Sequence, residues 1–146
     1  MILFKKVKDF DGKVKMPTKV DNGSAGYDFY LCEEVTIKPK ETIVVPTNIK
    51  AQMPEDMVLL LYIRSSIGIK RKIALACGTG VIDSSYYENP NNDGNIQITL
   101  YNYGEETQTL KSGERVMQGV FVKYYNTTDY KPSKGKRQGG IGSSGK

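Results

Sequence analysis

Three observations predict that this sequence folds as one all-β domain. Short runs rich in β-branched and aromatic residues recur along the chain at intervals typical of sandwiches and barrels. Turn-forming pairs such as Asp11-Gly12 and Asp93-Gly94 lie between these runs. Helical periodicity is confined to residues 66–72, about two turns at most. With 146 residues, of which 38% are hydrophobic and 25% charged, the chain is long enough to bury a single core.

The predicted strands share strand-forming residue types and are bounded by turn residues. In chain order they are 1–7, 27–31, 35–37, 42–45, 48–52, 57–64, 73–75, 81–82, 96–101, 107–110 and 115–125. Residues 96–100 alternate between apolar and polar side chains, as expected for a strand with one buried face. Many short strands with at most one short helix predict a sandwich or barrel.

Composition excludes several classes of protein. The chain has no His, so a Ser-His-Asp or Cys-His nucleophile and a His-ligated zinc site are excluded. The two cysteines, Cys32 and Cys77, are interpreted as free buried thiols in a reducing compartment. The longest apolar run, 57–63, is too short to span a bilayer, and the first residues lack the pattern of a signal peptide. We therefore expect a cytoplasmic protein, in a bacterium or in a cell infected by a phage or virus, without membrane contact.

Basic charge is concentrated at the C-terminus. Residues 126–146 hold five basic residues and one acidic residue, a balance of +4 within a net charge of +5 for the whole chain. Such a segment suits a polyanion such as a triphosphate, or is simply a solvated arm. Its one aromatic residue, Tyr130, argues against nucleic acid, whose bases usually stack on several rings. We divide the chain into a β-domain, 1–130, and a flexible Gly/Ser-rich arm, 131–146.

Two segments of the body carry candidate chemistry. Arg64, Ser65 and Ser66 follow the apolar run 57–63 and form either an anion site at the start of the short helix or merely its N-cap. Asp83 follows two β-branched residues and is either a general base or a carboxylate that caps the next turn. Tyr86 is either a core residue or a platform for a base or sugar.

The C-terminal arm carries a third candidate. Successive Gly and Ser residues expose backbone N–H groups that can surround phosphate oxygens, and Arg137 adds a fork of donors. The arm is therefore interpreted as a segment that closes over a nucleotide, with a disordered tail as the alternative.

Taken in order, these pieces resemble the five motifs of the trimeric deoxyuridine triphosphate nucleotidohydrolases, or dUTPases. The resemblance extends from about Ser24 to Gly145. The matching segments are residues 24–29, 64–66, 80–86, 113–118 and 137–145.

The resemblance implies a β-barrel or jelly-roll protomer in a homotrimer whose active sites are shared between subunits. The first, second and fourth motifs would come from one subunit, the third from a neighbour and the fifth from the remaining one. The reaction would convert dUTP and water into dUMP and pyrophosphate, which limits uracil incorporation into DNA and supplies dUMP. Mg²⁺ would be held mainly by the substrate triphosphate, as this ion commonly is.

The resemblance also implies roles for single residues. Asp83 would activate the attacking water and Gln118 would hold it. Asp28 would contact the metal indirectly, through water. Tyr86 would pack against the deoxyribose, and the hairpin 77–81 would read uracil. The residues expected to contact substrate are Arg64, Ser65, Ser66, Cys77, Gly78, Thr79, Gly80, Val81, Ile82, Tyr86, Arg137, Gly140, Ile141, Gly142, Ser143 and Ser144.

The sequence departs from the family pattern at several points. Ile141 stands where a ring usually stacks on uracil, so we expect an active enzyme with somewhat weaker substrate affinity. An additional segment runs from Glu88 to Asp93, and we interpret it as an inserted surface loop and a possible surface for a protein partner.

Two alternatives stay open beside a dUTPase. A dCTP deaminase shares the protomer fold, but that relative needs an acidic residue on the strand at 97–101, where this chain has none. A regulatory, protein-binding module on the dUTPase fold is the other alternative.

Overall fold

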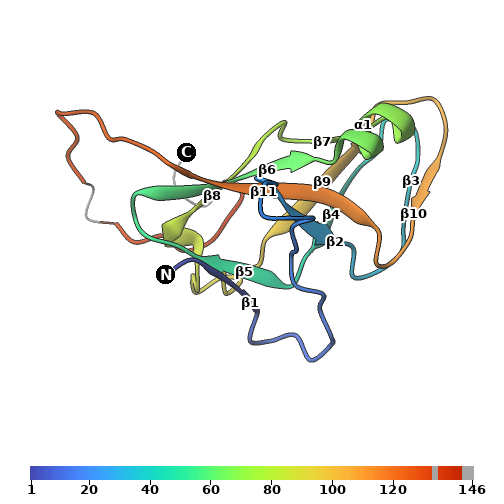
Figure 1. Ribbon diagram of the computed structural model, residues 1–146. Helices are drawn as coiled ribbons and strands as arrows, with labels where there is room; N and C mark the ends of the chain where they lie inside the picture. The colour runs from blue at the N-terminus through green and yellow to red at the C-terminus, as the bar shows by residue number, and fades with distance from the viewer. Residues whose placement is uncertain (133–134, 143–146) are drawn as a thin grey trace.

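The computed structural model describes residues 1–132 and 135–142, and Figure 1 shows their course. Within these residues the chain forms β-strands, one α-helix, α1 (Ser65–Arg71), and one 3₁₀ turn, η1 (Ser84–Tyr86). The strands are β1 (Leu3–Lys6), β2 (Tyr27–Tyr30), β3 (Val35–Ile37), β4 (Thr42–Pro46), β5 (Ile49–Gln52), β6 (Met57–Ile63), β7 (Ile73–Leu75), β8 (Gly80–Asp83), β9 (Gln97–Asn102), β10 (Gln108–Leu110) and β11 (Arg115–Lys123).

The strands form antiparallel sheets around one apolar core. A four-stranded sheet has the order β2-β11-β6-β8, and a three-stranded sheet has the order β4-β9-β7. Two further pairs, β1-β5 and β10-β3, complete the enclosure. The core draws side chains from both larger sheets, including the fully buried Phe29, Leu59, Ile98 and Leu100.

The predicted fold class is confirmed, and each predicted strand has a counterpart. The runs 35–37 and 73–75 coincide with β3 and β7. The predicted runs 1–7 and 115–125 are shorter in the structure, where β1 ends at Lys6 and β11 ends at Lys123. On β9, Ile98 and Leu100 are buried and Gln97 and Thr99 are partly exposed, so the alternation in the sequence corresponds to two different faces.

The start of α1 differs from one of the two sequence interpretations. Arg64, with extended backbone, occupies the N-cap position, and it makes no side-chain cap hydrogen bond. Ser65 and Ser66 are already inside the helix, so the N-cap role considered for them is wrong. The Arg64 backbone N–H instead donates to the carbonyl oxygen of Val116, which lies where the pairing of β11 with β2 shifts register. The end of β6 is thereby fixed against β11.

The two cysteines are free, as predicted, but the prediction that both are buried is wrong. Cys77 is exposed because it lies in the turn between β7 and β8, and Cys32 is partly exposed. Within residues 1–132 and 135–142, no helix is long and apolar enough to cross a membrane. After β11 the chain leaves the sheets and returns toward β8 (Figure 1). The division at residue 130 between domain and arm stays a prediction.

Candidate active site

A cleft of about 560 Å³ opens beside β8. Such a volume is suited to a small-molecule ligand. Asp83 and Arg137 are the charged groups among its described lining residues, and most of the remaining wall is apolar. The predicted site residues that line it are Cys77, Thr79, Gly80, Val81, Ile82, Asp83, Tyr86, Arg137, Gly140 and Ile141.

The opposite wall of the cleft is formed by residues that the sequence does not single out. Thr42 and Val44 come from β4, and Gln97 and Thr99 come from the polar face of β9. The alternation along 96–100 indicates this polar face, but no sequence pattern shows that it borders a ligand cleft. The pairing of β4 with β9 places all four residues on neighbouring strands.

Asp83 is the candidate base, and the structure argues against its alternative role as a capping residue. It ends β8 and occupies the N-cap position of η1, yet its side chain makes no cap hydrogen bond. The predicted alternative of a capping carboxylate is therefore wrong. The Asp83 side chain is 46% exposed, and its Oδ2 accepts a hydrogen bond from Nη2 of Arg137.

Arg137 connects the arm to the third motif of the same chain. Its Nη2 lies 2.5 Å from Oδ2 of Asp83, its Nε donates to Oγ of Ser85 across 3.1 Å, and its Nη1 donates to the Gly139 carbonyl across 2.9 Å. The guanidinium also lies 5.8 Å from the ring centroid of Tyr86, within the range of a cation–π contact. The planar fork of an arginine suits such several-sided contact.

Tyr86 lines the cleft, with 6% of its surface exposed. Its hydroxyl donates to the Asn95 carbonyl and accepts from Asn92, each across 2.7 Å. Burial raises the pKa of this phenol further above its ordinary value of 10.0. Gly140 packs so closely that a β-carbon there would lie 3.0 Å from the Tyr86 ring.

A second group of predicted residues gathers elsewhere on the same sheet. Asp28 on β2 pairs with Gln118 on β11, and its carboxylate accepts from Nη1 of Arg115 across 3.1 Å. Nε of Arg64 lies 4.0 Å from the other carboxylate oxygen. Gly26 faces Gln118 so closely that any β-carbon would collide with the Gln118 side chain. The first, second and fourth motifs are thus brought together by one chain.

The two groups are far apart within one chain. Gln118 pairs with Tyr62 on β6, whereas Asp83 pairs with Val58 on that strand. Four strand residues correspond to about 13 Å, and Gln118 and Asp83 also lie on opposite sides of β6. Because β side chains stand perpendicular to their sheet, these two residues of one chain do not reach the same water molecule.

The described part of the arm lies against the third motif of its own chain, through Arg137 on Asp83 and Gly140 on Tyr86. This differs from the arrangement implied by the resemblance, in which these two motifs come from different subunits. Ile141, 80% exposed, lines the outer wall of the cleft, and Gly142 has a positive φ of 76° that suits glycine. Ser143 and Ser144 lie outside the described residues.

The segment from Glu88 to Asp93 is not simply a surface loop. Glu88 is exposed, but Asn89 and Asp93 are buried, and Asp93 forms an ion pair with the buried Lys50. The interpretation as a loop wholly on the surface is wrong, because this segment packs against Tyr86 and β5. Partner binding through its exposed residues stays a prediction.

Among the described residues, no three His, Cys, Asp or Glu side chains lie close enough together to hold a metal ion. Asp28, the residue predicted to contact a metal through water, is held between Arg115 and Arg64. A metal ion at this site would therefore depend on oxygen ligands from a bound phosphate compound and from water.

The fold and the cleft define an all-β protein with a small-molecule site, bordered by a carboxylate, an arginine and a glycine-rich arm. The dUTPase family profile matches residues 12–145, and the chain belongs to this family. It is similar to the deoxyuridine 5′-triphosphate nucleotidohydrolase of Lactococcus lactis, with 38% identity over 90% of this chain and 89% of that protein.

Solved structures show the same fold. The dUTPase from Streptococcus mutans superposes with a TM-score of 0.79 and 37% identity, covering 85% of this chain and 97% of that one. A mutant dUTPase from phage phi11 of S. aureus, studied for the coordination of a structural Mg(II) ion, superposes with a TM-score of 0.75. At 22% identity, over 92% of this chain and 97% of that one, it supports the fold alone.

Proposed function

We propose that the protein hydrolyses dUTP to dUMP and pyrophosphate, which limits uracil incorporation into DNA and supplies dUMP. Membership of the dUTPase family and the similarity to named nucleotidohydrolases support this reaction. The observation that carries the proposed site is the position of Asp83, a half-exposed carboxylate on the rim of an apolar cleft beside Tyr86 and Arg137.

Asp83 accepts a proton from water as the water oxygen attacks the α-phosphorus. The bond from the α-phosphorus to the bridging oxygen breaks, and its electron pair leaves with pyrophosphate. Gln118 holds the water, since an amide can both donate and accept. Arg64, Ser65 and Ser66 bind phosphate oxygens and stabilise the charge that moves toward the leaving group.

The other side chains give specificity and closure. Tyr86 packs against the deoxyribose and leaves no room for a 2′-hydroxyl. The segment 77–82 reads uracil through its backbone and excludes a 5-methyl group by shape. Arg137 and the arm residues from Gly140 to Ser144 close over the phosphates, with Ile141 giving an aliphatic contact in place of a stacked ring.

The proposed cofactor is Mg²⁺, carried into the site mainly by the triphosphate. The side chains fit this mode, because the described carboxylates form no ligand cluster and Asp28 is already held by Arg115. When bound, the ion would neutralise phosphate charge, with Asp28 as the predicted indirect contact through water.

We also propose a cytoplasmic homotrimer with active sites shared between subunits. The separation of Gln118 from Asp83 along β6 supports sharing, because these residues of one chain lie too far apart to hold one water molecule. A neighbouring subunit would supply the missing half of each site.

The reaction is tested by measuring pyrophosphate release from dUTP, UTP, dTTP and dCTP in the presence of Mg²⁺. A preference for dUTP by orders of magnitude is expected. Comparable rates on all four nucleotides would contradict the proposal. Ammonia released from dCTP would support a deaminase instead.

A further inference from the structure

The loop between η1 and β9 holds the Tyr86 hydroxyl from two sides. Asn92 donates from Nδ2 to Oη, and Oη donates to the Asn95 carbonyl, each across 2.7 Å. The phenol thus uses its proton in one hydrogen bond and accepts another. Two such bonds restrain both the rotation and the translation of the ring.

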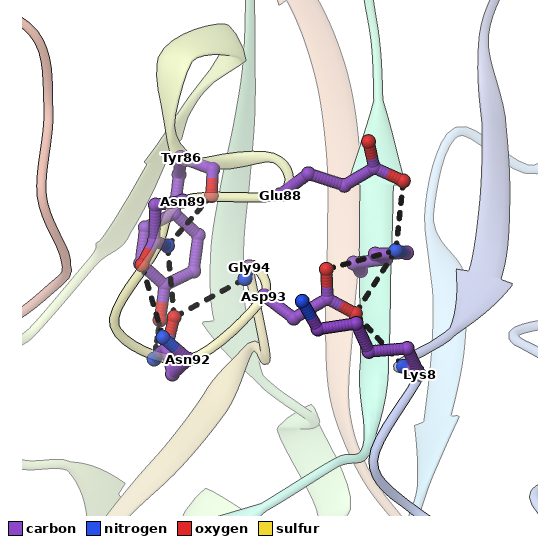
Figure 2. Close-up of polar contacts among 8 residues, drawn as sticks. Lys8, Tyr86, Glu88, Asn89, Asn92, Asp93 and Gly94 are labelled. Atoms are coloured by element: carbon purple, nitrogen blue, oxygen red, sulfur yellow. Dashed lines mark hydrogen bonds and ion pairs between the residues drawn. The ribbon is translucent and has the colours of Figure 1, made fainter.

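A second amide holds the backbone of Tyr86 and also holds Asn92. Asn89 Nδ2 donates to the Tyr86 carbonyl and to Oδ1 of Asn92, each across 2.8 Å. Oδ1 of Asn92 also accepts from the Gly94 backbone N–H. Figure 2 shows Asn89 and Asn92 beside the Tyr86 ring, with the chain turning around them. The orientation of Asn92 is therefore itself fixed.

The far side of this loop is anchored to the body of the protein. Lys50 on β5 donates to Glu88 across 2.9 Å and to both carboxylate oxygens of Asp93 across 3.0 and 3.1 Å. Asp93 also accepts from the Lys8 backbone N–H. Glu88 and Asp93 extend to the side of the loop away from Tyr86 (Figure 2). The loop thus connects Tyr86 to β5 and to the chain that follows β1.

We propose that Asn92 is a positioning residue for sugar selection: it keeps the Tyr86 ring where a 2′-hydroxyl would collide with it. This inference rests on the proposed function, in which Tyr86 packs against the deoxyribose. A ring discriminates by shape only while it stays in place, because a mobile ring can move aside for the larger ribose. Positioning to within a fraction of an ångström usually depends on such supporting hydrogen bonds.

The test is a double-mutant cycle on the ratio of kcat/KM for dUTP to that for UTP. Asn92→Ala should lower this ratio by roughly threefold to tenfold, the size expected for one hydrogen bond. In the Tyr86→Phe background, Asn92→Ala should leave the ratio unchanged because its partner oxygen is gone. Asn126→Ala is the control, since Asn126 is an exposed amide that lies outside the cleft lining and outside the loop that holds Tyr86. The ratio of kcat/KM for dUTP to that for UTP in this control variant should equal that of the parent chain.

Asn92→Asp serves where the alanine variant folds poorly, since it keeps Oδ1 but loses the Nδ2 donor. An equal change of the ratio in both backgrounds, or no change in either, would overturn the positioning role. Calorimetry with dUDP and UDP gives the corresponding ratio of binding affinities without turnover. A parent chain that prefers dUDP but hydrolyses no dUTP would contradict the proposed reaction alone. A parent chain that binds neither would overturn both proposals.

Discussion

Arg137 and Asp83 form an ion pair that joins the C-terminal arm to the end of β8, with 2.5 Å between Nη2 and Oδ2. The arginine side chain is 18% exposed and the carboxylate side chain 46%. The negative charge of Asp83, the proposed base, is thus balanced by Arg137, the group that is proposed to bind phosphate. In the proposed reaction a bound triphosphate would offer the guanidinium a second anion, which would couple the position of the arm to the availability of the base through this one contact.

Asp83→Asn should keep nucleotide binding and lose most turnover. The amide cannot accept the proton of the attacking water, and general-base contributions are typically on the order of 10²–10⁴-fold. Steady-state kinetics with dUTP measure the loss, and calorimetry with dUDP checks that binding persists. Ser85→Ala is a useful control, since it removes another Arg137 partner without removing the carboxylate. Retention of more than about half of kcat would exclude Asp83 as the base.

Gly26→Ala should reduce turnover by displacing Gln118. The added β-carbon would collide with Oε1 of Gln118, so the amide on β11 would have to move away from Gly26, the residue before β2. Since Gln118 is proposed to hold the attacking water, kcat should fall more than KM rises. Gly23→Ala serves as the control, because a β-carbon at Gly23 would meet only Oδ1 of Asp21, at an ordinary contact distance of 3.5 Å. A Gly26→Ala enzyme with parental kcat would show that this contact does not orient Gln118.

Strand chemistry made the fold predictable, because the half-buried strands alternate and the turns between them carry Gly, Pro, Asn or Asp. For the cleft, the sequence predicted individual lining residues such as Asp83 and Tyr86, but not the strands β4 and β9 that also border it. Lys50 lies between Ile49 and Ala51 on β5, where alternation indicates an exposed lysine, yet three successive residues of this strand are buried. Its partner Asp93 is 43 positions away, so no local pattern signals their ion pair. The same long-range packing explains why the segment from Glu88 to Asp93, expected to be a surface loop, packs against Tyr86.

Lys50→Met should lower the free energy of unfolding by about 3–5 kcal/mol, because it leaves the Asp93 carboxylate buried without its main charged partner. The Lys50 and Asp93 side chains are each only 7% exposed. Thermal and denaturant unfolding measure the loss. Lys123→Met is the control, since its ion pair with Asp56 is exposed and should contribute little. Equal losses in the two variants would contradict a special role for the buried pair.

Acid should remove the contribution of the buried pair to stability. Burial tends to raise the pKa of Asp93, but the Lys8 backbone N–H and the Lys50 ammonium outweigh this, so the pKa is lowered from its ordinary value of 3.8. A lowered folded-state pKa gives stability that is present above the unfolded value and is lost as pH falls through the folded one. The free energy of unfolding should therefore fall below about pH 4, and less steeply in Asp93→Asn. Parallel acid profiles for the parent and this variant would show that Asp93 does not contribute.

Mixed subunits test which site the arm serves. Ending the chain at Ser133 should leave the Tm nearly unchanged, since no described arm residue belongs to the apolar core, while turnover falls sharply. The contact of Arg137 with Asp83 of its own chain predicts that arm and base act in one site. Tail-less chains mixed with Asp83→Asn chains should then recover no activity after verified subunit exchange, because every site has either a base without an arm or an arm without a base. Recovered activity would instead show that the arm reaches a site built by other subunits, as the family resemblance implies. The parent chain mixed with Asp83→Asn, carried through the same exchange, controls for loss of activity during the procedure.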